Sequence, residues 1–330
     1  MINPSFLLNY IAGHSIEVPN SIAYGVGDTL FIMTNTHQAY TATGPNTVQA
    51  IPQEPHNRNG FHIHYDSINR RVITDGLVKY WDQSNKGWFF FLEDGVSAEP
   101  ADLGDHFQGR QFNESNRQSN HFWFFQDISF YRAEFSEEPH SRSPQYYLTP
   151  RQRLFSILET SKGQVFIGGM EGLYQLDEDG TSKPITHHPA LQNRIEDIVE
   201  MPNEALILGT KGGGILIWHA DTTLQISAAQ GLTSSSIEQI HVDERQQIWV
   251  GTNKGLNRIH LNEDWSFTVE SITYADGLPS NEITDITSKG LQLSVATVRG
   301  ILSFPIAKQF SNGPVAPVID QVRVNGINYA

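Results

Sequence analysis

Short apolar segments alternate with polar turns along most of this chain. Residues 237–261 show the pattern clearly: an apolar segment, a polar turn, a second apolar segment that ends in Gly251-Thr252, a Gly turn and a third apolar segment. The apolar positions recur with a period of two or form short runs rich in β-branched and aromatic residues, which is typical of strands and not of helices. The pattern therefore predicts antiparallel hairpins.

The same plan recurs along the sequence. Residues 154–176, 195–218 and 283–304 repeat it closely, whereas residues 22–43, 61–82 and 121–135 repeat it weakly. In the segment 61–82 the pair Asp75-Gly76 is the expected turn. The seven repeats start near residues 22, 61, 107, 154, 195, 237 and 283, a period of about 40 to 46 residues.

A four-stranded antiparallel unit of this length, repeated seven times, is typical of a β-propeller. We therefore expect an all-β chain that forms a seven-bladed β-propeller of four-stranded antiparallel blades. An eight-bladed ring is the alternative, if residues 83–120 contain a further blade.

The two ends of the sequence predict how the ring closes. The last repeat supplies three strands before the Pro-rich residues 313–317, and residues 5–11 with the loop after them match residues 266–272 and their loop. We expect this N-terminal strand to complete the last blade, because closure removes exposed sheet edges. The expected domains are a propeller over residues 1–312 and, over 313–330, a linker with the first strand of a second domain, a short β tail.

Composition excludes several classes of function. The 330 residues include 22 basic and 36 acidic side chains, a formal net charge of −14, and no cysteine. Without cysteine there is no disulfide scaffold, zinc–thiolate site or thiol nucleophile. A strongly negative chain does not suit nucleic acid or an anionic membrane surface, which are bound by positive charge.

Two motifs carry a family resemblance. They are Gln247-Ile-Trp-Val-Gly-Thr-Asn-Lys-Gly-Leu256 and Tyr274-Ala-Asp-Gly-Leu-Pro-Ser-Asn-Glu-Ile283. Together they resemble the two-component-regulator propeller repeats of bacterial sensor histidine kinases, typically of Bacteroidetes. The resemblance is good over the four repeats from residue 154 onward and poor before it. The tail 317–329 resembles the first strand and hairpin of the tyrosine-motif (Y_Y_Y) immunoglobulin-like domain that follows such propellers.

This resemblance implies a function. The chain would be the periplasmic sensor region of an inner-membrane sensor or hybrid histidine kinase, with the signal peptide, membrane helix and signalling domains outside this sequence. Its partner would be a glycan or another small nutrient-derived ligand, and the full-length receptor could form a homodimer. The sensor region itself is not expected to be an enzyme.

Blade geometry indicates a ligand-binding face. In a propeller blade, the turn between the second and third strands and the loop into the next blade open on one face, and the chain leaves from the other face near Phe304. The candidate ligand-binding residues on the outward face are Asn35, Asp75, Arg194, Lys211, Asn253, Lys254, Asn281 and Arg299.

The four basic members of this set fall in the last three repeats and would form a basic patch suited to an acidic sugar or a carboxylate. The alternative is that all eight are ordinary solvated turn residues, with the asparagines supplying turn geometry.

The sequence offers little support for catalysis, a metal or a cofactor. It has no Gly-x-Ser-x-Gly elbow, no His-Glu-x-x-His and no phosphate loop. His62 and His64 share one face of a strand, but no third ligand has suitable spacing, so no metal site is expected. The runs 88–91 and 122–125 could stack on sugars, although four apolar residues in a row also fit a buried sheet. Because fold does not determine function, a propeller lyase or hydrolase and a protein-interaction scaffold remain alternatives.

Overall fold

The computed structural model describes residues 17–25, 28–36, 38–43, 48–50 and 152–307, together with the strands between residues 57 and 147 and two strands in the tail. This described part consists of β-strands, turns and three short 3₁₀ helices. None of its helices is long and apolar enough to cross a membrane. The expectation of an all-β chain is confirmed.

The strands form consecutive antiparallel sheets, each ordered as the chain runs. The first three sheets are β1 (Pro19–Tyr24), β2 (Leu30–Thr34), β3 (Ala39–Ala42) and β4 (Val48–Ala50); β5 (Asn57–Asp66), β6 (Arg71–Val78), β7 (Gly87–Leu92) and β8 (Ala98–Asp102); and β9 (Gln111–Glu114), β10 (His121–Gln126), β11 (Ser129–Glu134) and β12 (Gln145–Tyr147). The next three are β13 (Leu154–Glu159), β14 (Val165–Gly169), β15 (Gly172–Leu176) and β16 (Ser182–Pro184); β17 (Ile195–Glu200), β18 (Leu206–Thr210), β19 (Gly214–His219) and β20 (Thr222–Ile226); and β21 (Ile237–Val242), β22 (Ile248–Thr252), β23 (Gly255–Leu261) and β24 (Phe267–Ile272). A last sheet contains β25 (Ile283–Lys289), β26 (Gln292–Thr297) and β27 (Gly300–Pro305), and the tail forms a separate hairpin of β28 (Val322–Val324) and β29 (Ile327–Tyr329).

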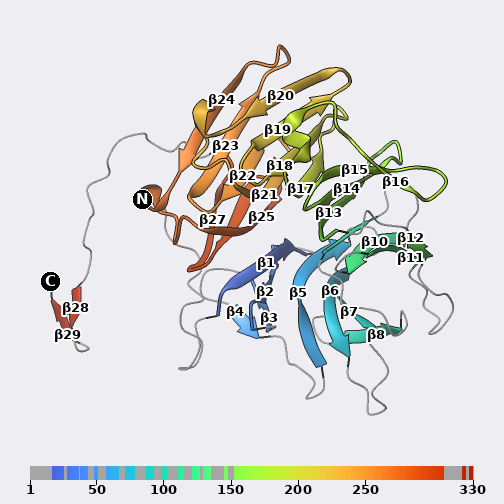
Figure 1. Ribbon diagram of the computed structural model, residues 1–330. Helices are drawn as coiled ribbons and strands as arrows, with labels where there is room; N and C mark the ends of the chain where they lie inside the picture. Colours follow the sequence, from blue (N-terminus) through green and yellow to red (C-terminus); the bar gives the residue numbers. More distant parts are fainter. Residues whose placement is uncertain are drawn as a thin grey trace.

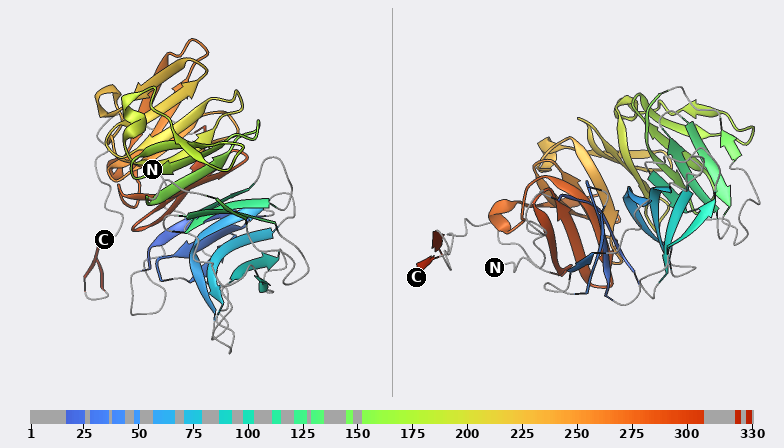
Figure 2. Two further views of the ribbon diagram at one scale, coloured as in Figure 1. Left: turned by 45° about the vertical axis from the view of Figure 1, so that its right-hand side comes forward. Right: turned by 90° about the horizontal axis from the view of Figure 1, so that it is seen from below.

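The sheets follow one another around the molecule, as blades do in a propeller (Figure 1). The first strand of a sheet contacts the first strand of the next at β1 and β5, at β9 and β13, and along β13, β17, β21 and β25. The chain order returns to its start, because β25 also contacts β1. Figure 2 shows the tail hairpin standing apart from these sheets.

The contact between the last sheet and the first is built from specific hydrogen bonds. The Ile22 amide donates to Asp285 Oδ2 at 2.7 Å, and Thr284 Oγ1 donates to the Pro19 carbonyl at 2.6 Å. The hydroxyls of Tyr24 and Ser294 lie 2.7 Å apart. Apolar residues of both sheets share one core cluster. The N-terminal strand expected to complete the last sheet, residues 5–11, lies outside the described residues.

Neighbouring sheets pack closely, and several sheets therefore need a glycine near the end of their second strand. A Cβ at Gly209 would lie 2.8 Å from Ile237 Cγ2, and one at Gly251 would lie 2.7 Å from Ile283 Cγ2. Ile237 and Ile283 each begin the next sheet and are almost fully buried. The Gly-Thr pair of the repeat therefore lets the next isoleucine reach the backbone of the preceding sheet.

One expected turn is wrong. Asp75-Gly76 lies inside β6, which pairs with β5 from Asn57↔Val78 to Asp66↔Arg71. The pairing shifts between Asn59 and Ile63, opposite this Asp-Gly pair, so the glycine marks a strand irregularity and not a hairpin turn. Asp75 is therefore not a turn residue.

The chain leaves the last sheet on the face predicted from the repeat. The Ile306 amide donates to the carbonyl of Leu291, which lies in the turn between β25 and β26. We call this side the exit face. The opposite side, with the turns 210–214, 252–255 and 297–300 and the loops 227–236 and 273–282, we call the outward face.

Candidate functional site

Buried threonines fix the turns of the outward face. The Thr252 hydroxyl donates to the Gly255 carbonyl at 2.9 Å and accepts from the Lys254 amide at 3.0 Å. Thr210 and Thr297, also fully buried, make the same two bonds in their own turns. Each turn therefore stands on a rigid base. Asn253, Lys254 and Arg299 are exposed at the tips of the turns 252–255 and 297–300.

The loops between sheets are equally well ordered. Residues 273–277 form a 3₁₀ turn with a Thr273–Asp276 capping box, and Gly277 follows with φ 104°. Asn281 Oδ1 accepts the Tyr274 amide at 2.6 Å. Ser235 Oγ does the same for Ala228 one sheet earlier, at 3.0 Å. The Asn281 side chain is therefore engaged in holding its loop, as the turn-geometry alternative expects.

Asn35 has a comparable structural partner. Its Oδ1 accepts the Val18 amide at 2.9 Å, and its own amide donates to the Val18 carbonyl at 2.9 Å. The turn after β2 is thereby tied to the segment that leads into β1. Asn35 remains exposed, so its side chain is available at the rim of the face.

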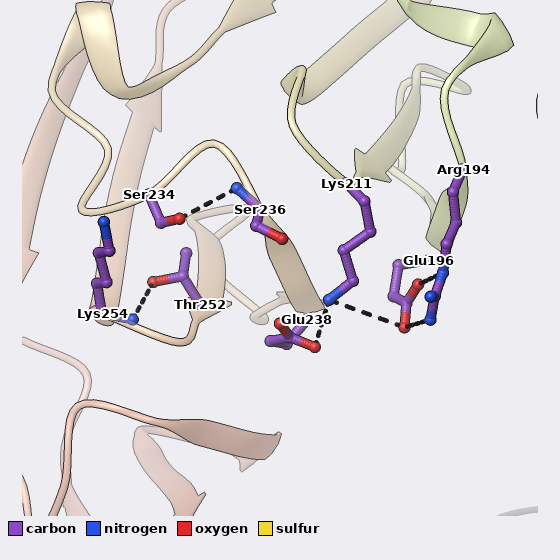
Figure 3. Close-up of polar contacts among 8 residues, drawn as sticks. All are labelled: Arg194, Glu196, Lys211, Ser234, Ser236, Glu238, Thr252 and Lys254. Carbon is purple, nitrogen blue, oxygen red and sulfur yellow. Dashed lines mark hydrogen bonds and ion pairs between the residues drawn. The ribbon is translucent and has the colours of Figure 1, made fainter.

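Arg194 and Lys211 lie in a network of alternating charges (Figure 3). Arg194 donates to both carboxylate oxygens of Glu196, at 2.6 and 2.8 Å. Lys211 Nζ lies 2.5 Å from Glu238 Oε2 and 3.9 Å from Glu196 Oε1. All four side chains are partly buried, and their formal charges cancel. The expected basic patch is therefore half neutralised, because only Lys254 and Arg299 of its four members lie outside this network.

A β-bulge explains how the two glutamates reach the outward face. In β17, Ile195 pairs with Thr210 and Asp197 with Gly209, which leaves Glu196 as the extra residue. Glu238 is the extra residue of β21 in the same way. A bulge redirects the side chain of the residue that it adds.

Further bulges bring other side chains to the start of the first strands. In five sheets the second residue of the first strand is the extra residue of a β-bulge. These residues, which we call the bulge ring, are Asn20, Phe155, Glu196, Glu238 and Thr284. All five are half-buried. Arg194 Cζ lies 3.7 Å from the centre of the Phe155 ring, so this ring contacts the charge network through Arg194. The bulge ring thus offers amide, aromatic, carboxylate and hydroxyl groups around the first strands.

The buried Asp197 and the half-buried Asp285 join neighbouring sheets just below this ring. Asp197 Oδ1 accepts the Ile198 amide at 2.9 Å, and Oδ2 accepts the Ile240 amide of the next sheet at 2.7 Å. Asp285 makes the equivalent pair of bonds to Ile286 and Ile22. Burial raises the pKa of Asp197 to about 7, and the charges of Asp285 and Glu196 act in the same direction. These acids were missed from the sequence, although Ile-x-Asp-Ile at 195–198 and 283–286 was a readable signal.

Among the described residues, no group of three or more His, Asp or Glu side chains is arranged to hold a metal ion. His62 and His64 lie on β5, but their side chains are outside the described part. His241 Nε2 lies 2.7 Å from Ser288 Oγ between β21 and β25, and burial lowers the His241 pKa to about 4. That pair is part of the packing between two sheets and not of the outward face.

Two tryptophans of the described part, Trp249 and Trp123, belong to the core. Trp249 is fully buried, and its Nε1 donates to Asp243 Oδ2 at 2.8 Å. Trp123, in the apolar run 122–125, is 3% exposed and donates to Glu159 Oε2 at 2.6 Å. Trp123 therefore follows the buried-sheet alternative, whereas the side chains of the run 88–91 lie outside the described residues.

No family model and no curated protein matches the chain. Solved structures do resemble it. The extracellular domain of the putative hybrid two-component system BT3049 from B. thetaiotaomicron has a TM-score of 0.70 at 16% identity, over 98% of this chain and 44% of that chain. The extracellular domain of the putative one-component system BT4673 from the same organism has a TM-score of 0.68 at 17% identity, over 92% and 40%. Virginiamycin B lyase from Staphylococcus aureus has a TM-score of 0.65 at 12% identity, over 91% and 97%. At these identities the likeness is one of fold, so the chain shares the propeller-like fold of these proteins and spans less than half of the two extracellular domains.

Proposed function

We propose that this chain is the extracytoplasmic ligand-sensing domain of a two-component signal-transduction regulator. The observation that carries the proposal is the likeness over 98% of the chain to the extracellular domain of BT3049, joined to the regulator-type motifs at residues 247–256 and 274–283. A periplasmic location, anchoring to the inner membrane through segments outside this sequence and dimerisation of the full-length receptor are parts of the same proposal.

In this proposal the seven sheets form a closed seven-bladed propeller over residues 1–312. Support comes from the hydrogen bonds and shared core between the first and last sheets. The N-terminal residues 5–11 would supply the fourth strand of the last blade. Residues 313–330 would be the linker and the beginning of a Y_Y_Y immunoglobulin-like domain.

The ligand would bind on the outward face, at the bulge ring and the exposed turns next to it. The ion-pair network of Arg194, Glu196, Lys211 and Glu238 presents donors and acceptors side by side. Such a surface suits the hydroxyl groups of a neutral saccharide better than it suits an isolated anion, and Phe155 adds an apolar ring. We therefore narrow the expected ligand from an acidic sugar to a hydroxyl-rich one at this face.

A library of neutral oligosaccharides screened by thermal shift tests this function. We expect at least one member to raise the Tm without being consumed, and Phe155→Ala with Glu238→Gln to abolish that shift. Lys183→Ala, which changes an exposed residue of β16, is the control and should leave the shift unchanged. Lack of any shift across the library would contradict the saccharide-sensing proposal.

A propeller enzyme is the second candidate, because virginiamycin B lyase matches the chain over 97% of its own length. The same screen separates the two functions when each hit is incubated with protein and its products are separated by chromatography. Turnover of a hit at a rate proportional to protein concentration would favour the enzyme. An intact hit favours the sensor.

A further inference from the structure

The exit face contains a pocket that the proposed outward site does not use. It has a volume of about 290 Å³ and lies between the sheet of β21–β24 and residues 306–307, where the chain leaves β27. Two rows of side chains line its wall: Arg258 pairs across the strands with Glu270, and His260 pairs with Thr268. A pocket of this size is at the lower end for small-molecule sites.

One wall of the pocket is rigid and carries a guanidinium. Arg258 forms an ion pair with Glu270, donates to the Ile306 carbonyl at 2.9 Å and lies 5.5 Å from the centre of the Trp249 ring. Its side chain is 15% exposed, so these contacts fix its position. The planar group is therefore preorganised, with one carboxylate already balancing its charge.

The second guanidinium has no such partner. Arg245 is exposed in the turn between β21 and β22, and its side chain makes no ion pair with any described residue. His260 lies on the same wall. In a chain with a net charge of −14, this pocket combines Arg245 and Arg258 with a single carboxylate, Glu270. An unpaired guanidinium at the edge of a pocket suits a carboxylate, which it can bind through two hydrogen bonds.

An unpaired hydrogen-bond acceptor indicates a second group that a ligand of this pocket would need. Gln247 lines the pocket, and its Oε1 is buried without a hydrogen-bond partner. A buried acceptor left unpaired costs free energy, so a rotation of the Gln247 side chain toward a ligand hydroxyl would gain a hydrogen bond. A carboxylate would bind Arg245 and a hydroxyl group would bind Gln247. A hydroxy acid carries both groups in one molecule.

We propose that this pocket binds a small hydroxy acid, with its carboxylate on Arg245 and a hydroxyl group donating to Gln247 Oε1. The ligand would also contact residues 306–307, the last described residues before the chain continues toward the tail. The site lies on the opposite face from the bulge ring, so its failure would leave the outward-face function standing.

Isothermal titration calorimetry on the full chain tests the site with three probes: D-galacturonate, D-galactose and succinate. We expect galacturonate to bind most tightly, succinate more weakly and galactose without measurable heat. Arg245→Ala should weaken galacturonate binding roughly tenfold or more, because charge-assisted hydrogen bonds are lost. Gln247→Ala should weaken galacturonate and leave succinate within about twofold.

Lys183→Ala is the matched control, since it removes one exposed positive charge in β16, away from the pocket and from the bulge ring. It should leave galacturonate binding unchanged, which separates local recognition from the effect of net charge. Thermal unfolding of each variant verifies that it is folded. Absence of binding by both acids, or an equal loss in Arg245→Ala and Lys183→Ala, would overturn the proposal.

Discussion

At the scale of single residues, Asp197 combines burial with two backbone hydrogen bonds, one within its own strand and one to Ile240 of the next sheet. Its pKa is raised to about 7, mainly by burial, from an ordinary value of 3.8. The folded protein therefore holds this proton more tightly than the unfolded chain does. The stabilisation from Asp197 is complete below pH 3.8 and is lost as the pH rises through about 7.

We predict that Asp197→Asn removes this pH dependence. Wild type should lose stability relative to the variant as the pH rises from about 4 to about 7, because the variant has no proton to release at this position. Thermal unfolding of both proteins at several pH values measures the difference in Tm. Asp221→Asn, at an exposed turn, controls for the loss of one acidic side chain. Parallel profiles for wild type and Asp197→Asn would show that the carboxyl does not titrate in this range.

At the scale of elements, the repeat predicts the hairpins from β13 to β27 because their turn chemistry is local. Gly212-Gly-Gly214 forms the turn between β18 and β19, and the buried Thr210 secures it. Where the local signal misleads, the cause is the partner strand: Asp75-Gly76 looks like a hairpin turn but lies opposite an irregularity in β5.

The candidate site was less predictable than the hairpins. The turn positions of Lys211, Asn253, Lys254 and Arg299 follow from the repeat. The pairing of Lys211 with Glu238 does not, because Glu238 belongs to the next sheet and reaches the outward face only through the bulge in β21. A local sequence pattern predicts neither the bulge nor which side chains of two adjacent sheets come into contact.

The close approach of sheets gives a second prediction. Gly251→Ala should destabilise the protein by about 1–3 kcal/mol, because the new Cβ would lie 2.7 Å from Ile283 Cγ2. Chemical denaturation measures the loss. The double variant Gly251→Ala with Ile283→Ala should lose less than the sum of the two single variants, since the clash and the cavity offset each other. If the losses in the free energy of unfolding were strictly additive, the strain in Gly251→Ala would not come from the contact with Ile283.

At the scale of the whole molecule, the last sheet contacts the first, as it would in the proposed closed propeller. Asp285 and Thr284 bond to the backbone of β1, and the two sheets share a core. The last sheet has three strands in the described part of the chain. Residues 5–11 are proposed to pair with β27 as its fourth.

Deletion of residues 1–11 tests this closure. We expect the deletion to lower the Tm and to promote self-association, because it would leave the edge of β27 unpaired. Removal of residues 1–4 is the matched control and should have little effect. Size-exclusion chromatography and thermal unfolding supply both readouts. An unchanged Tm and a monomeric product after the longer deletion would contradict the N-terminal closure.

The central claim, ligand sensing at the outward face, is tested most directly by hydrogen–deuterium exchange with and without the saccharide that gives the largest thermal shift. We predict slower amide exchange in the turns and loops of the outward face, at residues 191–196, 210–214 and 231–238, with the saccharide recovered intact. Protection absent from all of these segments, or conversion of the saccharide during the experiment, would contradict the account.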